Sequence, residues 1–300
     1  MARALPVSNP DKVLYPAAGF TKADVVDYYR AVAPVLVPHL KGRALTLRRF
    51  PDGVDDESFF EKRCPAHAPD WVATVEVTRS SGPSYRACSV EDADTLVWLA
   101  NLAALELHPS LALAVDPDRP TTMVFDLDPG APAAIGECAE VACNLRRLLQ
   151  DLDLESVAKT SGLKGMQVYV PFNTDVDFDT TKTLSHTIGL ILQKQMRPLV
   201  VTTMSRGERP GKVFIDWSQN DRAKTTVSVY SLRARDHPSA STPLTWDEVE
   251  KAVGAGKEAL VFSPQEVLGR VERSGDLFSP VRERRQKLPE AVSRLLESRP

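Results

Sequence analysis

The chain lacks a long hydrophobic run: no stretch of its 300 residues is apolar enough to span a bilayer. The first residues, MARALPVSNPDK, lack the apolar core and cleavage site of a secretory signal peptide. Cysteine is scarce, with four residues and no C-x-x-C pair, which excludes a disulfide-rich scaffold. These absences predict a cytoplasmic protein with reduced thiols and no membrane partner.

The chain also lacks a strong excess of charge of either sign. Its net charge of −3 neither favours nor excludes a nucleic-acid partner, so the placement of basic residues matters more than their number. Hydrophobic residues make up 43% and charged residues 26%, which is typical of a globular protein with a buried core. No internal repeat or low-complexity linker occurs.

Helix and strand signals alternate along the chain without a strict rhythm. Capping pairs such as Thr21 with Asp24 and Ser89 with Asp92 precede apolar-periodic segments. Helices are predicted over residues 21–37, 89–107, 132–152 and 180–196, with shorter ones starting at Thr245 and Ser263. Strands are predicted over residues 44–50, 121–128, 166–172, 199–204, 212–217 and 225–234. This mixture predicts an α/β or α+β fold with mixed or antiparallel sheets flanked by helices.

The segment MVFDLDPG places two aspartates at the end of an apolar strand. Asp126 and Asp128 share one face of that strand, and keeping both ionised costs several kcal/mol unless a cation lies between them. Asp216 ends a second apolar strand, VFID. Three converging carboxylates suit Mg²⁺ or Mn²⁺. The alternative is that the D-x-D pair only caps a strand or turn, which is the commoner meaning of so short a motif.

The segment KTSGLKGMQVYVP is a Ser/Gly/Lys loop ahead of a strand. Small residues let backbone N–H groups approach an anion, the Ser161 hydroxyl can donate, and Lys164 adds charge. It is not a Walker A loop, and an ordinary glycine turn with an exposed lysine is the alternative. Gln219 and Arg233 follow Asp216, and arginines hold phosphates where charge develops in phosphoryl transfer. Together these features describe a nucleotidyltransferase that uses two metal ions.

The sequence resembles the archaeo-eukaryotic-primase-type polymerases of bacterial DNA repair, specifically the ligase D polymerase domain and its stand-alone relatives. The resemblance runs from about residue 8 to about 290. Eight motifs in order carry it: NPDKVLYP (9–16), FTKADVVDYY (20–29), FFEKRCPAHAPDWV (59–72), ELHP (106–109), FDLDP (125–129), KTSGLKGMQVYVP (159–171), VFIDWSQN (213–220) and YSLRAR (230–235). It implies a single catalytic domain over residues 1–300, with an N-terminal lobe over about 1–110, a catalytic core over about 111–240 and a helical part over about 241–300.

The resemblance assigns roles to individual residues. Metal ligands would be Asp126, Asp128 and Asp216, and the triphosphate of the incoming nucleotide would lie against Ser161, Lys164, Arg209, Gln219 and Arg233. His108 matches a functional histidine of the family; at a helix C-terminus it could equally be structural.

Four further residues match DNA-binding positions of the family. Lys12 and Lys22 match positions that bind a downstream 5′-phosphate, and helix N–H groups beside Thr21 would reinforce that binding. Phe59 and Phe60, in a polar acidic loop, match a pair that stacks on template bases. The alternatives are two exposed lysines, and a pair in which at least one phenylalanine packs into the core.

The chain departs from the family at two places. Gln167 replaces a histidine that contacts the nucleotide phosphates, and glutamine can donate a hydrogen bond there but carries no charge. Cys64 and His67 have a spacing that could begin a zinc site, but no second ligand pair lies nearby. Both departures indicate the stand-alone branch associated with ligase C. Because no K-x-D-G ligase motif is present, a separate ATP-dependent DNA ligase is expected as partner, and Ku as well if the chain acts in end joining.

The leading hypothesis is therefore a metal-dependent repair primase-polymerase. It would bind a DNA gap or break through the 5′-phosphate, add NTPs or dNTPs by template, with the family's preference for ribonucleotides, and associate with the nucleoid. A primase that starts chains de novo belongs to the same class. The rivals from other classes are a non-catalytic DNA-end or gap-binding module, in which Gln167 marks lost chemistry, and an unrelated metallohydrolase.

Overall fold

The computed structural model describes residue 3 and residues 5–78, 82–290 and 292, and these form two compact units. The first unit comprises residues 1–115, 225–242 and 262–276, and the second comprises 116–224, 243–261 and 277–300. The chain thus returns to the first unit twice, so the units do not follow the three consecutive segments that the sequence suggested. Residues 291 and 293–300 of the expected helical C-terminal part lie outside the described residues.

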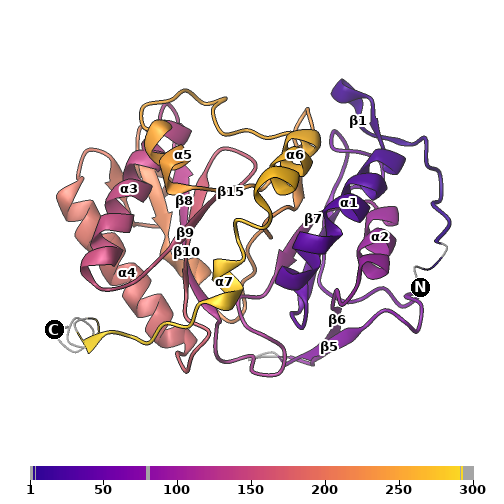
Figure 1. Ribbon diagram of the computed structural model, residues 1–300, viewed down its shortest axis with the longest axis horizontal. Helices are drawn as coiled ribbons and strands as arrows, with labels where there is room; N and C mark the ends of the chain where they lie inside the picture. Colours follow the sequence, from indigo (N-terminus) through magenta and orange to yellow (C-terminus); the bar gives the residue numbers. More distant parts are fainter. Residues whose placement is uncertain (1–2, 4, 79–81, 291, 293–300) are drawn as a thin grey trace. The chain divides into compact units, whose positions relative to one another are not determined.

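The first unit joins an antiparallel sheet to two helices that pack against each other, α1 and α2 (Figure 1). Its elements are β1 (Val13–Tyr15), β2 (Phe20–Thr21), α1 (Lys22–Leu40), β3 (Leu45–Arg49), β4 (Phe59–Glu61), β5 (Thr74–Val77), β6 (Tyr85–Cys88), α2 (Ala93–Asn101), β7 (Ala104–Pro109), β13 (Leu232–Arg233), β14 (Ser239–Ala240) and α6 (Pro264–Ser274). Strand β3 pairs with β4, β6 and β7, all antiparallel.

The second unit is built on a six-stranded sheet in the order β11-β12-β8-β10-β9-β15. Its elements are β8 (Thr122–Pro129), α3 (Ile135–Asp151), β9 (Val157–Thr160), β10 (Met166–Pro171), α4 (Phe178–Gln195), β11 (Val200–Val201), β12 (Val213–Asp216), β15 (Pro243–Leu244), α5 (Trp246–Lys251) and α7 (Pro280–Glu283). Only β11 and β12 are parallel, so the prediction of mixed and antiparallel sheets flanked by helices is confirmed.

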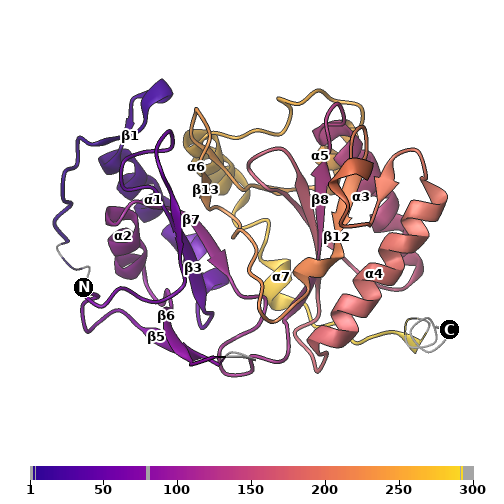
Figure 2. The ribbon, with the colours of Figure 1, turned by 180° about the vertical axis from the view of Figure 1, so that it is seen from behind.

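Helices α3 and α4 cover one face of the six-stranded sheet (Figure 2). Leu127 and Ile215 are paired across β8 and β12, both are fully buried, and both point to this face. Gly189 in α4 lies against this face, since a Cβ atom there would be at an ordinary contact distance, 3.8 Å, from the Ile215 side chain. The helices therefore fix which face of β8 is core, and Asp126 and Asp128 must lie on the other.

The capping pairs fix several helix starts as predicted. Thr21, Thr245 and Ser263 each form a complete capping box with an acidic residue three positions later. These boxes stabilise the first turns of α1, α5 and α6.

Two sequence predictions of secondary structure are wrong. The helix expected over 89–107 is capped by Asp92 rather than Ser89 and ends at Asn101, and residues 104–109 form strand β7 instead. Ala103 has a positive φ of 56°, which ends the helix, and pairing with β3 then outweighs the helix propensity of ALEL. In the strand expected over 225–234, Tyr230 also has a positive φ (63°), and only Leu232–Arg233 is a strand.

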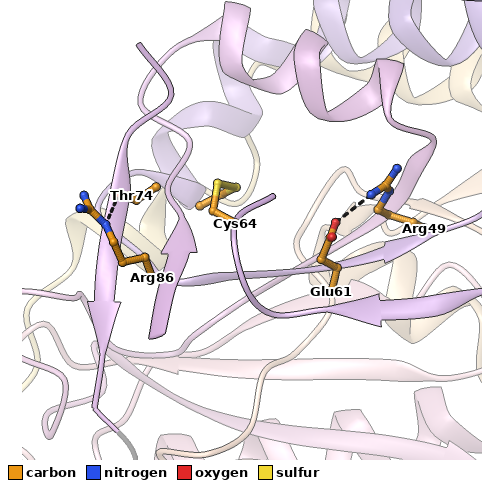
Figure 3. The surroundings of a disulfide bond; sticks show 6 residues. Arg49, Glu61, Cys64, Thr74 and Arg86 are labelled. Atoms are coloured by element: carbon orange, nitrogen blue, oxygen red, sulfur yellow. Dashed lines mark hydrogen bonds and ion pairs between the residues drawn. A yellow bond between two sulfur atoms is a disulfide. The ribbon is translucent and has the colours of Figure 1, made fainter. Parts of the chain in front are cut away.

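The expectation that all cysteines are reduced is wrong for Cys64 and Cys88, which form a disulfide (Figure 3). The Cys64 backbone N–H also donates to the Arg86 carbonyl at 2.8 Å, so the segment after β4 is fastened to β6. Cys138 and Cys143 are free and buried. Because the Cys64 sulfur is bonded to Cys88, it is not a zinc ligand in this state. Within the described ranges, no helix is long and apolar enough to cross a membrane.

Candidate active site

Three of the predicted site residues form one cross-strand row on the face of the six-stranded sheet opposite α3 and α4. Asp126 on β8 lies directly opposite Asp216 on β12 and directly opposite Gln167 on β10. Directly opposite residues in antiparallel strands project to the same face, and Asp128 lies on that face two residues along β8. The strand register therefore brings together the three aspartates and Gln167.

The carboxylates of this row repel one another. Burial, the charge of Asp128 and then that of Asp216 raise the pKa of Asp126 to about 7, although a hydrogen bond from Gln167 opposes the rise. Gln167 is 3% exposed and accepts a hydrogen bond from the Tyr169 hydroxyl at 3.3 Å. The residue that replaces the family histidine thus supports Asp126 directly.

The Asp216 carboxylate accepts hydrogen bonds from the residues that follow it in the chain. Its Oδ1 accepts hydrogen bonds from the Ser218 backbone N–H at 3.0 Å and from the Ser218 hydroxyl at 2.5 Å, and its Oδ2 accepts from Gln219 at 2.9 Å. Across the part of the chain that the structure describes, no group of three or more His, Cys, Asp or Glu side chains is arranged as a metal site. These hydrogen bonds from Ser218 and Gln219 fix the orientation of the Asp216 carboxylate.

The Ser/Gly/Lys loop connects β9 to β10 and closes on itself. The Ser161 hydroxyl accepts hydrogen bonds from the backbone N–H groups of Leu163 and Gly165, at 3.3 and 3.1 Å. A Cβ atom at Gly165 would lie 2.4 Å from the Leu127 carbonyl and 3.5 Å from Asp128, so only glycine fits there. Lys164 donates to the Pro129 carbonyl at 3.3 Å, which places its ammonium at the end of β8. The predicted phosphate loop is therefore packed beside the aspartate row.

Arg209 reaches the same end of β8 from the other side. Its guanidinium stacks 3.7 Å above the ring of Phe214, the residue opposite Asp128, and its Nη2 donates to the Met204 carbonyl at 3.1 Å. Its Nε atom is buried and has no hydrogen-bond partner among the described residues. A buried donor without a partner favours a ligand that can accept from it.

One residue of this row was not among the predicted site residues. Lys159 on β9 is directly opposite Gln167, is fully buried, and lies 5.6 Å from the Tyr169 ring centre. Its positive charge opposes the rise in the pKa of Asp126. Lys159 begins the KTSG motif, but lysine is rarely buried, so the sequence carries little signal for a buried role at this position.

The other predicted residues lie in the first unit. Lys12 and Lys22 are brought together by a hydrogen bond from the Lys22 backbone N–H to the Lys12 carbonyl, 2.8 Å. Burial, with the charges of Lys12 and Arg49, lowers the pKa of Lys22. Lys12 is paired with Asp52 at 2.6 Å. This local concentration of positive charge suits an anion such as a 5′-phosphate.

The prediction that backbone N–H groups at the start of α1 reinforce phosphate binding is wrong. The N–H groups of Lys22 and Ala23 donate to the carbonyls of Lys12 and Pro10, and that of Asp24 donates to the Thr21 hydroxyl. The start of α1 is thus satisfied by the chain itself, and the side-chain ammonium groups remain to attract an anion.

Phe59 and Phe60 lie on strand β4 rather than in a loop, and the expectation that at least one packs into the core is wrong. They are 45% and 59% exposed, because β4 is an edge strand. Phe59 lies against Arg49, and Phe60 lies on the opposite face against Arg48 and His108, with ring centres of Phe60 and His108 5.7 Å apart. The structure brings only Phe60 to His108.

His108 and Arg233 also meet, through a residue that the sequence did not single out. His108 lies on strand β7 and not at a helix end, and its Nε2 is 3.0 Å from Glu106 Oε2. Arg233 Nε is 3.3 Å from Glu106 Oε1. The predicted nucleotide-binding residues are thus divided, with His108 and Arg233 in the first unit and the others in the second.

A family model, several curated proteins and a solved structure are similar to this chain. Residues 21–278 match the family described as LigD, primase-polymerase domain. The multifunctional non-homologous end joining protein LigD of Mycolicibacterium smegmatis is 43% identical over 277 residues, which are 92% of this chain and 36% of that protein. The bifunctional LigD of Bacillus subtilis is 30% identical over 275 residues, or 91% of this chain and 43% of that protein. The chain therefore spans less than half the length of these curated relatives.

A solved structure shows the same fold. The polymerase domain from Mycobacterium tuberculosis Ligase D, in complex with DNA, superposes with a TM-score of 0.84 and 38% sequence identity, covering 99% of both chains. The family match gives the class of protein, which is a nucleotidyltransferase. Within it, this chain belongs to the LigD primase-polymerase domain family, whose members are typically metal-dependent.

Proposed function

We propose that this chain is a metal-dependent polymerase that fills short DNA gaps or breaks by template-directed addition of nucleotides. The single observation that carries the proposal is the register of β8 and β12, which sets Asp126 opposite Asp216 with Asp128 on the same face. Three carboxylates that repel one another are unfavourable in a structural role and favourable where a divalent cation binds.

The donor set fits such a cation. All donors are hard carboxylate oxygens, and burial together with the charges of Asp128 and Asp216 raises the pKa of Asp126 to about 7, so a bound cation would favour its ionised form. We assign Asp126, Asp128 and Asp216 as ligands of Mn²⁺ or Mg²⁺. Bound metal would activate the primer 3′-hydroxyl and stabilise the pyrophosphate leaving group. The hydrogen bond from Gln167 favours the ionised form of Asp126, which is the form that binds a cation.

The chain's own residues would bind and orient the substrates. Lys164, Ser161 and the unpartnered Nε of Arg209 lie around the end of β8, where they would hold the triphosphate. Gln219 already holds Asp216 and would orient it. In the first unit, His108 and Arg233 would be nucleotide-binding residues as well.

DNA would be held by the first unit. Lys12 and Lys22 would hold the downstream 5′-phosphate, and Phe59 and Phe60 would stack on template bases. Because the curated relatives are named as non-homologous end joining proteins, we extend that role to this chain. A separate ATP-dependent DNA ligase would seal the product, and Ku would be a partner at broken ends.

A non-catalytic module that binds DNA ends or gaps is the second candidate. This candidate is favoured by the hydrogen bonds that Ser218 and Gln219 donate to the Asp216 carboxylate, because they satisfy that carboxylate without a metal ion. The two candidates differ in whether metal and the aspartates matter to the outcome.

The test is primer extension across a short DNA gap with a 5′-phosphate, in Mn²⁺, with rNTPs and dNTPs compared. Asp126→Asn should lower templated addition by about 10³-fold, because a loss of about 4 kcal/mol of transition-state stabilisation has that effect. Asp151→Asn, an exposed aspartate at the end of α3, makes the same charge change away from the site and should have no effect. We expect ribonucleotides to be preferred. Tight gap binding without addition by the wild-type chain would instead establish the binding module.

A further inference from the structure

We propose that Glu106 is a positioning residue that holds His108 and Arg233 in place and keeps His108 ready to take up a proton when the nucleotide phosphates bind. The proposal rests on the proposed function, since it concerns the nucleotide-binding role of His108 and Arg233. Glu106 itself is buried too deeply to contact the substrate, with 1% of its surface exposed.

The strand register builds this cluster within the first unit. Phe60 on β4 lies opposite Arg48 on β3, and Arg48 lies opposite Glu106 on β7. These three side chains therefore share one face of the sheet, and His108, two residues along β7, shares it too. Arg233 reaches Glu106 from β13, which packs on β7.

The Glu106 carboxylate serves several groups at once. Its Oε2 is 3.0 Å from His108 Nε2, and its Oε1 is 3.3 Å from Arg233 Nε and 3.6 Å from an Arg48 Nη atom. Oε1 also accepts the backbone N–H of Ala234 at 3.2 Å, which fixes the residue after Arg233. One carboxylate thus sets both the side chain and the backbone position of the arginine.

Glu106 stays ionised despite its burial. Burial alone would raise its pKa, but the hydrogen bond with His108 and the charge of Arg233 lower it to about 2. The cluster has one negative charge against the two arginines, and His108 adds a third positive charge when it is protonated. An excess of positive charge around a buried carboxylate suits a polyanionic ligand such as a triphosphate.

Opposing effects set the protonation state of His108. Burial lowers its pKa, as do Arg233 and Arg48, whereas the Glu106 carboxylate opposes that shift. A hydrogen bond from Nε2–H to Glu106 leaves the other ring nitrogen to take up a proton, so that the ring can donate to an anion as well. Phosphate charge close to the ring would favour this proton uptake, and without Glu106 the ring would stay neutral.

The test compares Glu106→Gln, which keeps the shape and removes the charge, with Glu91→Gln, the same change at a partly exposed glutamate of the same unit. In primer extension we expect Glu106→Gln to raise KM for the nucleotide about 10- to 100-fold with a smaller change in kcat. By NMR, the pKa of His108, assigned among the five histidines with His108→Gln, should fall in Glu106→Gln and stay unchanged in Glu91→Gln. Glu106→Asp, which keeps the charge, should restore part of both effects.

Unchanged KM and unchanged His108 titration in a folded Glu106→Gln protein would overturn the proposal. If that variant does not fold, the wild-type chain is titrated with and without nucleoside triphosphate: the proposal requires the nucleotide to raise the His108 pKa, and no change overturns it. If the wild-type chain adds no nucleotide at all, the proposed function fails, while the NMR titrations still decide the role of Glu106.

Discussion

The two units of the molecule build their candidate sites in the same way and with opposite charge. In the second unit a row across four strands places Asp216, Asp126, Gln167 and Lys159 side by side, so carboxylates dominate. In the first unit a row across three strands places Phe60, Arg48 and Glu106 side by side, with His108 and Arg233 beside them, so cations dominate.

In both units, strand register brings residues that are distant in the sequence onto one face of a sheet, where they form a charged group. An uncompensated group of carboxylates is complementary to a divalent cation, and an uncompensated group of cations is complementary to phosphate. The predictions below change one row at a time.

The largest effect on stability should come from the disulfide of the first unit. The Cys64–Cys88 disulfide, with a sequence separation of 24, closes a loop whose cross-link should stabilise the folded state by about 3 kcal/mol. The double change Cys64→Ser with Cys88→Ser should therefore lower the free energy of unfolding in urea by that amount. Cys143→Ser, at a free cysteine, serves as the control. Equal stability of the wild-type chain with and without a dithiol reductant would contradict the prediction.

Removing one charge from the carboxylate row should stabilise the metal-free protein. The folded-state pKa of Asp126 is about 7, above its unfolded value of about 3.9, so the folded state binds an extra proton between these values. Its stability therefore falls as pH rises from about 4 through 7. Asp126→Asn should raise the free energy of unfolding at pH 8, in chelator, by about 2 kcal/mol and have little effect near pH 4. A variant that is less stable than wild type at pH 8 would show that repulsion does not dominate this row.

The smallest effect should separate the two phenylalanines. Phe60 shares a face with Arg48 and His108, and Phe59 lies on the other face beside Arg49. Phe60→Ala should weaken binding to gapped DNA by about 1 kcal/mol, or roughly fivefold, because one stacked base is lost. Phe59→Ala is the matched variant and should cost less. Fluorescence anisotropy with labelled DNA measures both, and a larger loss for Phe59→Ala would reverse the assignment.

Much of the second unit's site could be predicted from the sequence, because its signals are local. The D-x-D spacing places Asp126 and Asp128 on one face of a strand, and the Ser/Gly/Lys composition indicates a tight turn. The pairing of Asp126 with Asp216 joins strands 90 positions apart, and only the tertiary register reveals it. The same holds for Lys159, which lies between strands β10 and β15.

The first unit was harder to predict, because its signals are ambiguous. Ala, Leu and Glu favour helix, so residues 104–107 read as a helix until pairing with β3 is known. Read as a strand, the spacing of Glu106 and His108 would have placed both on one face. The disulfide was missed because two cysteines 24 positions apart carry no pairing signal of their own.

The central claim is that the carboxylate row binds metal, and titration with Mn²⁺ followed by electron paramagnetic resonance tests it most directly. The account predicts that the wild-type chain and Asp151→Asn bind Mn²⁺ alike, that Asp126→Asn loses this binding, and that wild-type affinity rises as pH rises through about 7, where Asp126 ionises. Equal Mn²⁺ binding by wild type and Asp126→Asn, or no binding by the wild-type chain with nucleotide present, would contradict it.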